Sequence, residues 1–518
     1  MSKASTCTTD PLNILNYDCA CLVLENLDLQ SLGNAEEVNE VWKETIQSWM
    51  TGSGLLQHFP DEWKKVTTMQ RDNNETAELP RYNRALKVFK NSAIDQLTTE
   101  AWKSGHANSL VLRNADVTHR MCPRWVGYLG GLSGAGEFLA WCETGRVLYK
   151  HVDSVHPAHE LNVGVSSDQV AHMELHAGGY LLVVVLDADR SSNHQHTERL
   201  FDLKTGKALW SRDLPPDLCA DLTGDGEEVD FKPLAMGWDR IYYFARERAK
   251  LLVRDFRTGR LLHTLHIGLF AQGFWAWEKS RVWRLRDRDV LVMFQHAPGS
   301  RYTNIGAVHL IDTVSGETLQ RIPVDSSEEC TLVTSTRRDE VAFALVWELM
   351  GYTDRDSFAV RTQTFDYDRG TGKFVERGVQ DIDLTHLKGL PVGWFYAGVM
   401  QYDPFRGFMV AADMEGQWTR VISLPGAQDQ SSSRGQVEPA VSSIVMGRRR
   451  AKAATVNVPG LVRSAIIGCG GKRLYFLRQP RGVFHDSVQV NIFEFGPKDE
   501  WRLQAGQGDS LHGPSSLA

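Results

Sequence analysis

The chain has 518 residues, of which 42% are hydrophobic and 23% charged, and this ordinary balance excludes a wholly disordered protein. A formal net charge of −7 and a pI near 6.2 indicate no basic surface for nucleic acid, so no nucleic-acid partner is expected. The longest purely apolar run, Tyr180 to Leu186, is too short to cross a bilayer, and the first ten residues lack the apolar core of a signal peptide, so no membrane partner is expected.

Residues 1–9 are predicted to be a disordered tail, and residues 10–50 to form a domain of two or three short helices. Asp10 is a predicted helix N-cap with Pro11 at the first helical position, and Asp18 is a predicted cap for the next helix. From Leu32 to Trp42, apolar residues recur every three or four positions, which predicts one helical face. So short a segment cannot bury this much apolar surface by itself, so it needs either the rest of the chain or another protein.

Residues 51–107 predict a looser helical linker that ends near Trp102 and Gly105. A polar stretch, 71–78, interrupts it and predicts a loop.

From residue 108 to about 500 the hydrophobic period changes from 3.6 to 2, which predicts β-strands. A unit recurs there: an apolar strand, an Asp, a Thr-Gly or Ser-Gly turn, and a second apolar strand. Its turns are Asp202-Leu-Lys-Thr205-Gly206, Asp255-Phe-Arg-Thr258-Gly259, Asp312-Thr-Val-Ser315-Gly316 and Asp368-Arg-Gly-Thr371-Gly372, with a weaker copy at Thr144-Gly145.

The five turn glycines are 61, 53, 57 and 56 residues apart, which corresponds to one four-stranded blade with loops. The strands Gly407–Ala412 and Arg473–Leu477 lack the Thr-Gly turn and suggest degenerate blades. The sequence therefore predicts a mainly β protein whose C-terminal part is a β-propeller of about seven blades, with six or eight as alternatives and a β-sandwich as the rival fold. Ser109 to Leu112 are predicted to close the ring against strands near Val488–Phe495.

Residues 426–458 are predicted to form a long loop, and residues 501–518 a disordered tail. The loop carries a basic run, Arg448, Arg449, Arg450 and Lys452. This run predicts a nuclear signal, a phosphate-binding patch or a clamp for a phosphorylated substrate, unless it is simply a solvated charged loop.

Sequence motifs for metal binding, phosphate binding or catalysis match only in part. The stretch from Asp221 resembles a calcium loop but has Lys232 where a bidentate Glu is needed. The order His172-Met-Glu174-Leu-His176 is wrong for a zinc protease, and the glycines of 130–136 precede a strand and not a helix. The eight cysteines include no Cys-x-x-Cys pair, which favours a reducing compartment, the cytoplasm or the nucleus. No cofactor, metal or catalytic residue is predicted.

The apolar pattern of residues 10–50 resembles the F-box, the helical motif by which substrate receptors bind the Skp adaptor of SCF ubiquitin ligases. The family usually has Leu-Pro where this chain has Leu15-Asn16, and the segment around Arg84 and Trp102 is similar to the linker of F-box proteins with WD-type repeats. The whole arrangement is similar to fungal F-box proteins with divergent propellers. The resemblance implies adaptor-binding residues Pro11, Leu12, Ile14, Leu15, Val23, Leu24, Leu27, Leu32, Val38 and Trp42.

The resemblance further implies a non-catalytic receptor that contacts a cullin through the adaptor and binds an unknown protein substrate on its propeller. Two alternatives remain. The chain is a propeller scaffold that works outside ubiquitin transfer, or an enzyme, because the repeated turn unit also resembles blades of pyrroloquinoline-quinone dehydrogenases. The alternative reading of residues 10–50 is an ordinary helical cap packed on the propeller.

Overall fold

The fold is taken from a computed structural model of the chain, which divides into two compact units: residues 1–108 with 494–518, and residues 109–493. The structure describes residues 14–72, 81–107, 109–116, 127–129, 138–143, 146–152, 154, 156–165, 170–176, 178–186, 196–213, 235–245, 250–266, 274–275, 281–285, 288–296, 305–325, 330–337, 340–350, 358–384, 399–412, 419–424, 441–443, 445–446, 460–467, 471–480 and 487–497.

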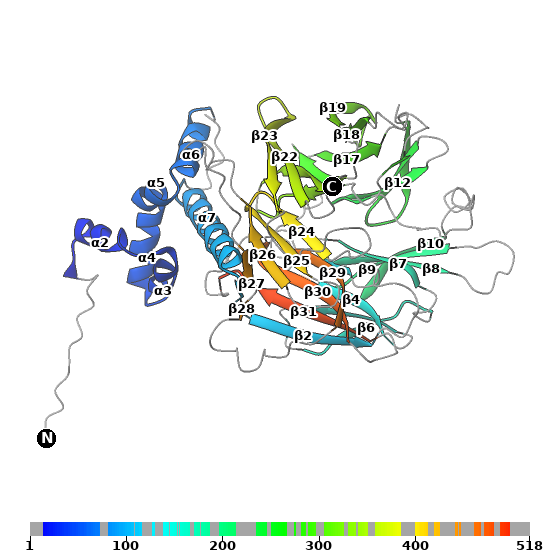
Figure 1. The fold of residues 1–518 in the computed structure, drawn as a ribbon, viewed down its shortest axis with the longest axis horizontal. Coiled ribbons are helices and arrows are strands. Elements are labelled where there is room, and N and C mark those ends of the chain that lie inside the picture. The colour runs from blue at the N-terminus through cyan, green and yellow to red at the C-terminus, as the bar shows by residue number, and fades with distance from the viewer. Residues whose placement is uncertain are drawn as a thin grey trace, which may run out of the picture. The chain divides into compact units, whose positions relative to one another are not determined.

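The first unit is helical (Figure 1). Its elements are α2 (Tyr17–Leu24), α3 (Leu29–Glu36), α4 (Glu40–Trp49), the π-helix η1 (Met50–Gly54), α5 (Leu55–His58), α6 (Pro60–Asp72), α7 (Arg81–Ser104) and the short strand β1 (His106–Ala107). Among the described residues, none of the helices combines the length and the apolar character needed to span a membrane.

Side-chain caps set the boundaries of the first three helices. The side chain of Asn16 accepts from the backbone N–H of Cys19, that of Asp28 from Ser31, and that of Asn39 from Trp42. The predicted cap at Asp18 is therefore wrong, because Asn16 takes that role and Asp18 falls in the first turn. The single helical face predicted from Leu32 to Trp42 is also wrong, because the Asn39 cap starts a new helix after α3 has ended. Asp10 and Pro11 lie outside the described residues.

The core of this unit is built from α2 to α7. Its buried apolar residues are Leu24, Leu29, Leu32, Ala35, Ile46, Trp49, Met50, Leu55, Val66, Ala85, Phe89, Ala93 and Ile94. The π-helix ends at a glycine that packs closely on its neighbour: a Cβ on Gly54 would lie 2.7 Å from the Trp49 ring, so only glycine lets the chain pass this close. After α7, Trp102 stacks on Phe495 with 3.7 Å between ring centroids, so the residues that follow the last strand complete the core around the end of α7.

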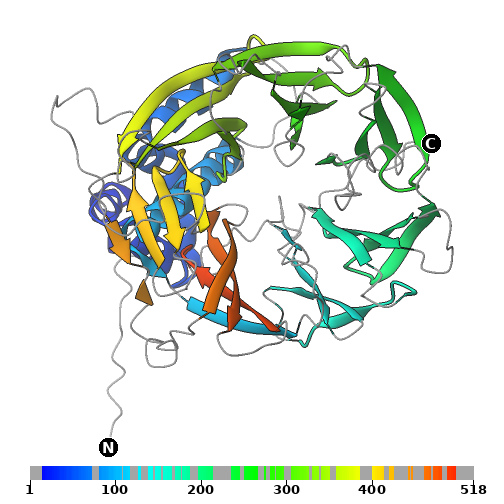
Figure 2. The ribbon, with the colours of Figure 1, turned by 45° about the vertical axis from the view of Figure 1, so that its right-hand side comes forward.

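The second unit is a β-propeller whose antiparallel sheets form a ring (Figure 2). In chain order the strands are β2 (Ser109–Asp116); β3 (Gly127–Leu129), β4 (Phe138–Glu143), β5 (Arg146–His151) and β6 (His159–Leu161); β7 (Val170–His176), β8 (Tyr180–Leu186), β9 (His196–Asp202) and β10 (Lys207–Asp213); β11 (Ala235–Met236), β12 (Arg240–Ala245), β13 (Lys250–Asp255) and β14 (Leu261–His266); β15 (Phe274–Trp275), β16 (Arg281–Leu285), β17 (Arg288–His296), β18 (Ile305–Asp312) and β19 (Thr318–Asp325); β20 (Cys330–Thr334), β21 (Ala342–Met350), β22 (Phe358–Asp368) and β23 (Lys373–Asp383); β24 (Val399–Asp403), β25 (Phe408–Ala412), β26 (Thr419–Ser423) and β27 (Val441–Ser443); β28 (Val445–Met446); and β29 (Gly460–Ile467), β30 (Arg473–Pro480) and β31 (Ser487–Glu494).

Most of these runs form one sheet each, in which strands that follow one another along the chain are paired. Among the described residues, six sheets have four strands each: β3–β6, β7–β10, β11–β14, β20–β23, β24–β27 and β2-β31-β30-β29. The β15–β19 sheet is irregular, because both β15 and β16 pair with β17. The structure therefore shows six regular four-stranded blades and this irregular five-stranded sheet, where the sequence predicted about seven blades.

The ring is closed by strands from its two ends. β2 is the outermost strand of the last sheet and lies beside β31, as the sequence predicted for Ser109–Leu112 and Val488–Phe495. Because this pairing gives the first strand a place in the last sheet, hydrogen bonds hold the two ends of the ring together.

The four repeated Asp…Gly turns each join the last two strands of their sheets. Gly206, Gly259, Gly316 and Gly372 have φ between 66° and 78°, a region that favours glycine. In each turn the glycine N–H donates to the carbonyl of the Asp four residues earlier, at 2.7–2.9 Å. In the first of them the Asp202 carboxylate also accepts from a backbone N–H within the turn, at 2.9 Å. The motif is therefore a hairpin-forming device.

Candidate protein-docking site

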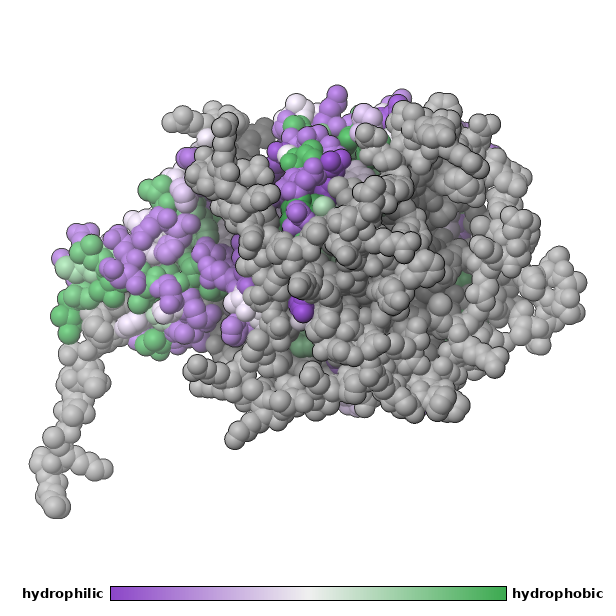
Figure 3. Space-filling model, in the orientation of Figure 1, coloured by the Kyte–Doolittle hydropathy of each residue, from purple (hydrophilic) through white to green (hydrophobic). Residues whose placement is uncertain are grey.

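The helical unit exposes apolar side chains on the outer sides of α2 and α4. Exposed fractions are 61% for Leu22 and 47% for Val23 on α2, and 43% for Val41 on α4. Ile14, Leu15 and Tyr17, before and at the start of α2, and Val38, before α4, are also exposed. Figure 3 shows hydrophobic residues gathered at the end of the helical unit where Figure 1 places α2. Such clustering is unusual for a surface that faces only water.

The predicted adaptor-binding residues fall into three groups. Ile14, Leu15, Val23 and Val38 are exposed. Leu24 and Leu32 are buried in the helical core, and Leu27 and Trp42 pack partly against it. Pro11 and Leu12 lie outside the described residues. The structure thus brings the predicted residues into one small domain but divides them between its surface and its core.

Sequence reasoning missed Tyr17, Leu22 and Val41. The Asn16 cap starts α2 at Tyr17, and within this helix Leu22 and Val23 are exposed while Leu24 is buried. The signal was present in the sequence, because Asn16 is as good a cap as Asp18 and lies directly before the apolar helix. The Tyr17 hydroxyl lies 3.4 Å from the Ser48 hydroxyl, which ties α2 to α4.

A buried ion pair holds the helices that carry this surface. Lys90 on α7 lies 2.6 Å from the carboxylate of Glu36 on α3, and both side chains are nearly nine-tenths buried. The Gln47 side chain on α4 donates to the same Glu36 oxygen at 2.5 Å. Three helices therefore share one carboxylate, which fixes their arrangement beneath the exposed residues.

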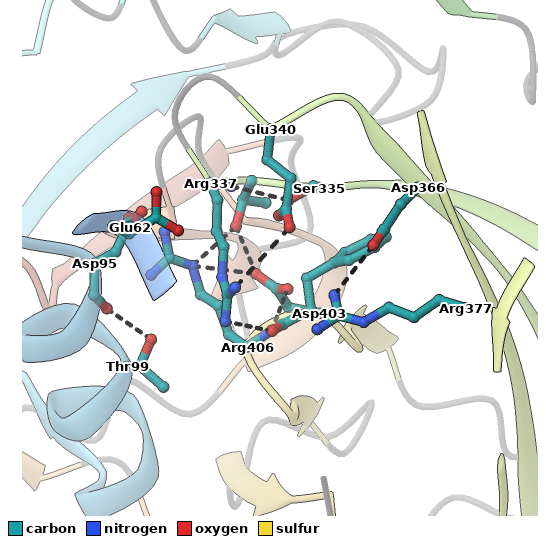
Figure 4. Close-up of polar contacts among 12 residues, drawn as sticks. Glu62, Asp95, Thr99, Ser335, Arg337, Glu340, Asp366, Arg377, Asp403 and Arg406 are labelled. Carbon is teal, nitrogen blue, oxygen red and sulfur yellow. Dashed lines mark hydrogen bonds and ion pairs between the residues drawn. The ribbon is translucent and has the colours of Figure 1, made fainter. Parts of the chain in front are cut away.

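The propeller contains a second polar centre at the turns between first and second strands (Figure 4). Arg406 and Asp403 are fully buried, 3.6 Å apart, in the β24–β25 turn. Thr336, from the β20–β21 turn, lies 2.5 Å from the Asp403 carboxylate, and its hydroxyl accepts from Arg406 Nε at 3.1 Å. A Cβ on Gly471, from the β29–β30 turn, would lie 2.7 Å from Arg406 Nε. Arg406 thus touches three sheets, and we call this group the Arg406 hub.

A neighbouring arginine adds a main-chain contact to the Arg406 hub. Arg337 donates to the carbonyl of Phe405 at 2.7 Å and lies 3.9 Å from Glu340, whose carboxylate accepts from the Ser335 hydroxyl. Each charged side chain of the Arg406 hub and its neighbour Arg337 is paired with a protein group, so the arrangement suits the joining of sheets rather than the binding of a ligand.

The other candidate sites gain no support. Asp221, Lys232, the glycines of 130–136 and the basic run Arg448, Arg449, Arg450 and Lys452 lie outside the described residues. His176 is buried among Tyr180, Trp238 and Phe256, and burial lowers its pKa to about 4. Among the described residues, no group of three or more His, Cys, Asp or Glu side chains is placed to hold a metal ion.

No family model matches the chain, and no curated protein matches it in sequence. Several solved propellers resemble it. The Dos1 propeller is 13% identical, with a TM-score of 0.38, covering 76% of this chain and 95% of its own. The WD40 domain of SCAP from fission yeast is 8% identical, with a TM-score of 0.38, covering 76% and 99%. The Nup133 β-propeller domain of Vanderwaltozyma polyspora is 8% identical, with a TM-score of 0.38, covering 74% and 98%. The propeller fold itself is established by the strand pairing described above.

Proposed function

We propose that this chain is a substrate receptor of an SCF-type ubiquitin ligase, and that its helical unit binds a Skp-type adaptor through the exposed apolar residues of α2 and α4. The observation that carries the proposal is the outward placement of Ile14, Leu15, Leu22, Val23, Val38 and Val41 on a domain that already has its own core. The F-box resemblance names the partner. The propeller would hold the target protein near the charged conjugating enzyme, so catalysis would occur by proximity.

The energetics favour a protein partner for this surface. Burying one large apolar side chain contributes roughly 1.5–3 kcal/mol, so burial of the exposed set together would offset much of the cost of association. The buried members of the predicted set, Leu24 and Leu32, would act indirectly by shaping the helices.

The test is co-purification of the full-length chain with a Skp-type adaptor. Leu22→Asp combined with Val23→Asp places two charges in the proposed contact without entering the core, and we expect adaptor capture to fall at least about tenfold. The matched control is Val375→Asp with Val379→Asp, at propeller positions of similar exposure, 52% and 51%. Circular dichroism checks that each variant is folded.

Equal capture by the wild type and the α2 variant would overturn the docking assignment. An intact chain that binds no Skp-type adaptor would favour the second candidate, a propeller scaffold that works outside ubiquitin transfer.

A further inference from the structure

Three consecutive sheets carry the same irregularity just after the Asp…Gly turn. In β10, β14 and β19 one extra residue, Leu209, Leu262 or Leu319, has no partner on the preceding strand. Each is the third residue after its turn glycine. Such a β-bulge redirects the side chain that follows it. The bulged leucines are exposed, and the fourth residue after each glycine, Trp210, His263 or Gln320, is partly buried.

The first of these fourth residues joins the β7–β10 sheet to the next one. Trp210 Nε1 donates to the carbonyl of Phe256, in the β11–β14 sheet, at 2.9 Å. The Trp210 ring also lies over the next turn glycine, where a Cβ on Gly259 would come within 2.8 Å of it. The glycine thus serves both the turn and the approach of the neighbouring sheet.

The second joins the β11–β14 sheet to the β15–β19 sheet. The ring nitrogen Nε2 of His263 donates to the carbonyl of Thr313 at 3.2 Å. Here too the neighbour approaches the turn glycine, because a Cβ on Gly316 would lie 3.1 Å from the Cβ of Leu265 on β14.

The third is bidentate. The side-chain amide of Gln320 donates to the carbonyl of Phe374 at 2.7 Å and accepts from the N–H of Phe374 at 2.8 Å. It thereby joins the β15–β19 sheet to β23 in the way that a paired strand residue would. Because Phe374 is buried, loss of this amide leaves its N–H and C=O without their partner.

The series changes at the next sheet. The fourth residue after Gly372 is Glu376, which accepts from Gln363 of its own sheet at 2.8 Å, and the bulge has moved two positions further from the glycine, to Arg377. The following sheet, β24–β27, has its Asp…Gly turn, Asp403 to Gly407, between its first two strands, where the Arg406 hub lies.

We propose that the bulge and the residue after it form a latch, in which each sheet bonds to the main chain of the sheet that follows it. This latch couples the outer hairpins of four successive sheets, from β9–β10 to β22–β23, into one unit that opens together. Each part of the repeat has one role in the latch. The Asp and Gly form the turn, the bulged Leu faces solvent, and the next residue bonds to the main chain of the following sheet. The coupling does not depend on the proposed adaptor binding.

Hydrogen–deuterium exchange of the full-length chain tests the latch. For Gln320→Leu, which keeps the side-chain size and removes the amide, we expect exchange to speed up roughly five- to a hundredfold. The acceleration should extend over all four hairpins, β9–β10, β13–β14, β18–β19 and β22–β23, and leave the β24–β25 turn and α3–α7 unchanged. Trp210→Phe, at the other end of the series, should accelerate the same four hairpins.

The matched control is Leu319→Ala, which changes the adjacent, exposed bulge residue and should leave exchange within about twofold of the wild type. Acceleration confined to the β22–β23 hairpin in Gln320→Leu would overturn the coupling. Equal acceleration of every propeller hairpin would also overturn it, because the amide would then support the whole ring and not one unit of it.

Discussion

The propeller joins its sheets in two different ways. Between β7 and β23 the outer hairpins are linked by neutral side chains that bond to main-chain groups, as Trp210 and Gln320 do. At the β20–β21, β24–β25 and β29–β30 turns the joint is instead a buried charge, Arg406, held by Asp403 and Thr336. The neutral joints recur in successive sheets and are individually weak, whereas the Arg406 hub is one charged joint that three sheets share. Buried carboxylates also join sheets elsewhere, because Glu198 and Asp289 accept from Tyr243 and Tyr242 of a neighbouring sheet.

The contrast indicates how each joint fails. A neutral hydrogen bond contributes on the order of 1 kcal/mol, so the loss of one loosens the ring without breaking it. A buried arginine and carboxylate are costly to separate, because removing either leaves the other charged, buried and unpaired. Loss of one neutral hydrogen bond is therefore expected to destabilise the propeller less than loss of Arg406.

Replacing Arg406 breaks the charged joint and has the largest expected effect. Arg406→Ala should destabilise the chain by about 3–5 kcal/mol, because Asp403 is left buried with fewer partners. Urea unfolding followed by tryptophan fluorescence measures the change. The control Arg361→Ala removes an arginine from an exposed ion pair. A loss below about 1 kcal/mol for Arg406→Ala would show that the two kinds of joint are energetically alike.

Gly259→Ala breaks a neutral joint by sterics. The residue has φ of 66°, and its Cβ would meet the Trp210 ring at 2.8 Å, so we expect a loss of about 2–4 kcal/mol in unfolding free energy. Gly378→Ala is the control, because a Cβ there meets nothing within 4 Å. Similar unfolding midpoints for the two variants would mean that the Trp210 contact constrains nothing.

An acid-sensitive contact in the same region sharpens the comparison further, because the buried His176 packs on Phe256 of the next sheet with 4.8 Å between ring centroids. Burial and the nearby Arg257 lower the pKa of His176 from 6.5 to about 4. The unfolded chain therefore binds the proton more readily, so stability is full above about pH 6.5 and falls as the pH drops towards 4. This one group should cost about 2 kcal/mol at pH 5 relative to pH 7. His176→Gln should lose less stability than the wild type over that range in urea titrations, and an unchanged loss would contradict the assignment.

The smallest effect is expected at an exposed ion pair within one sheet. Arg361 and Asp381 form two contacts, at 2.7 and 3.0 Å, with both side chains about half exposed. Asp381→Asn should change the unfolding free energy by less than about 1 kcal/mol, and by less still in high salt. Thermal unfolding at two salt concentrations measures this, and a larger, salt-independent loss would place this pair with the Arg406 hub.

The propeller was largely predictable because its repeat is local. Asp, Thr or Ser, and Gly at fixed spacing form a turn by themselves, so four copies predicted a regular series of hairpins. Asp403 and Gly407 were missed because Arg406 stands where the other copies have Thr or Ser, although the spacing and the positive φ at Gly407 are the same. The contacts between sheets could not be predicted, because Trp210 and Phe256 are brought together by the ring and not by sequence spacing.

The helical unit was predictable in kind but not in detail. Leucine spacing identified helices, yet it could not decide which apolar side chains face the core, because that depends on where the other helices pack. Adjacent residues of a helix point about 100° apart, so Leu24 is buried while its neighbour Val23 is exposed.

The pairing of β2 with β31 has a consequence for biosynthesis. β2 ends at residue 116 and β31 starts at 487, so about 370 residues must be translated before the first strand meets its partner. At roughly 5–20 residues per second this takes on the order of half a minute, during which β2 is a bare edge on the nascent chain. A truncated chain that ends before β31 would leave β2 unpaired and the ring open, and such a product would be a target for chaperones or proteases.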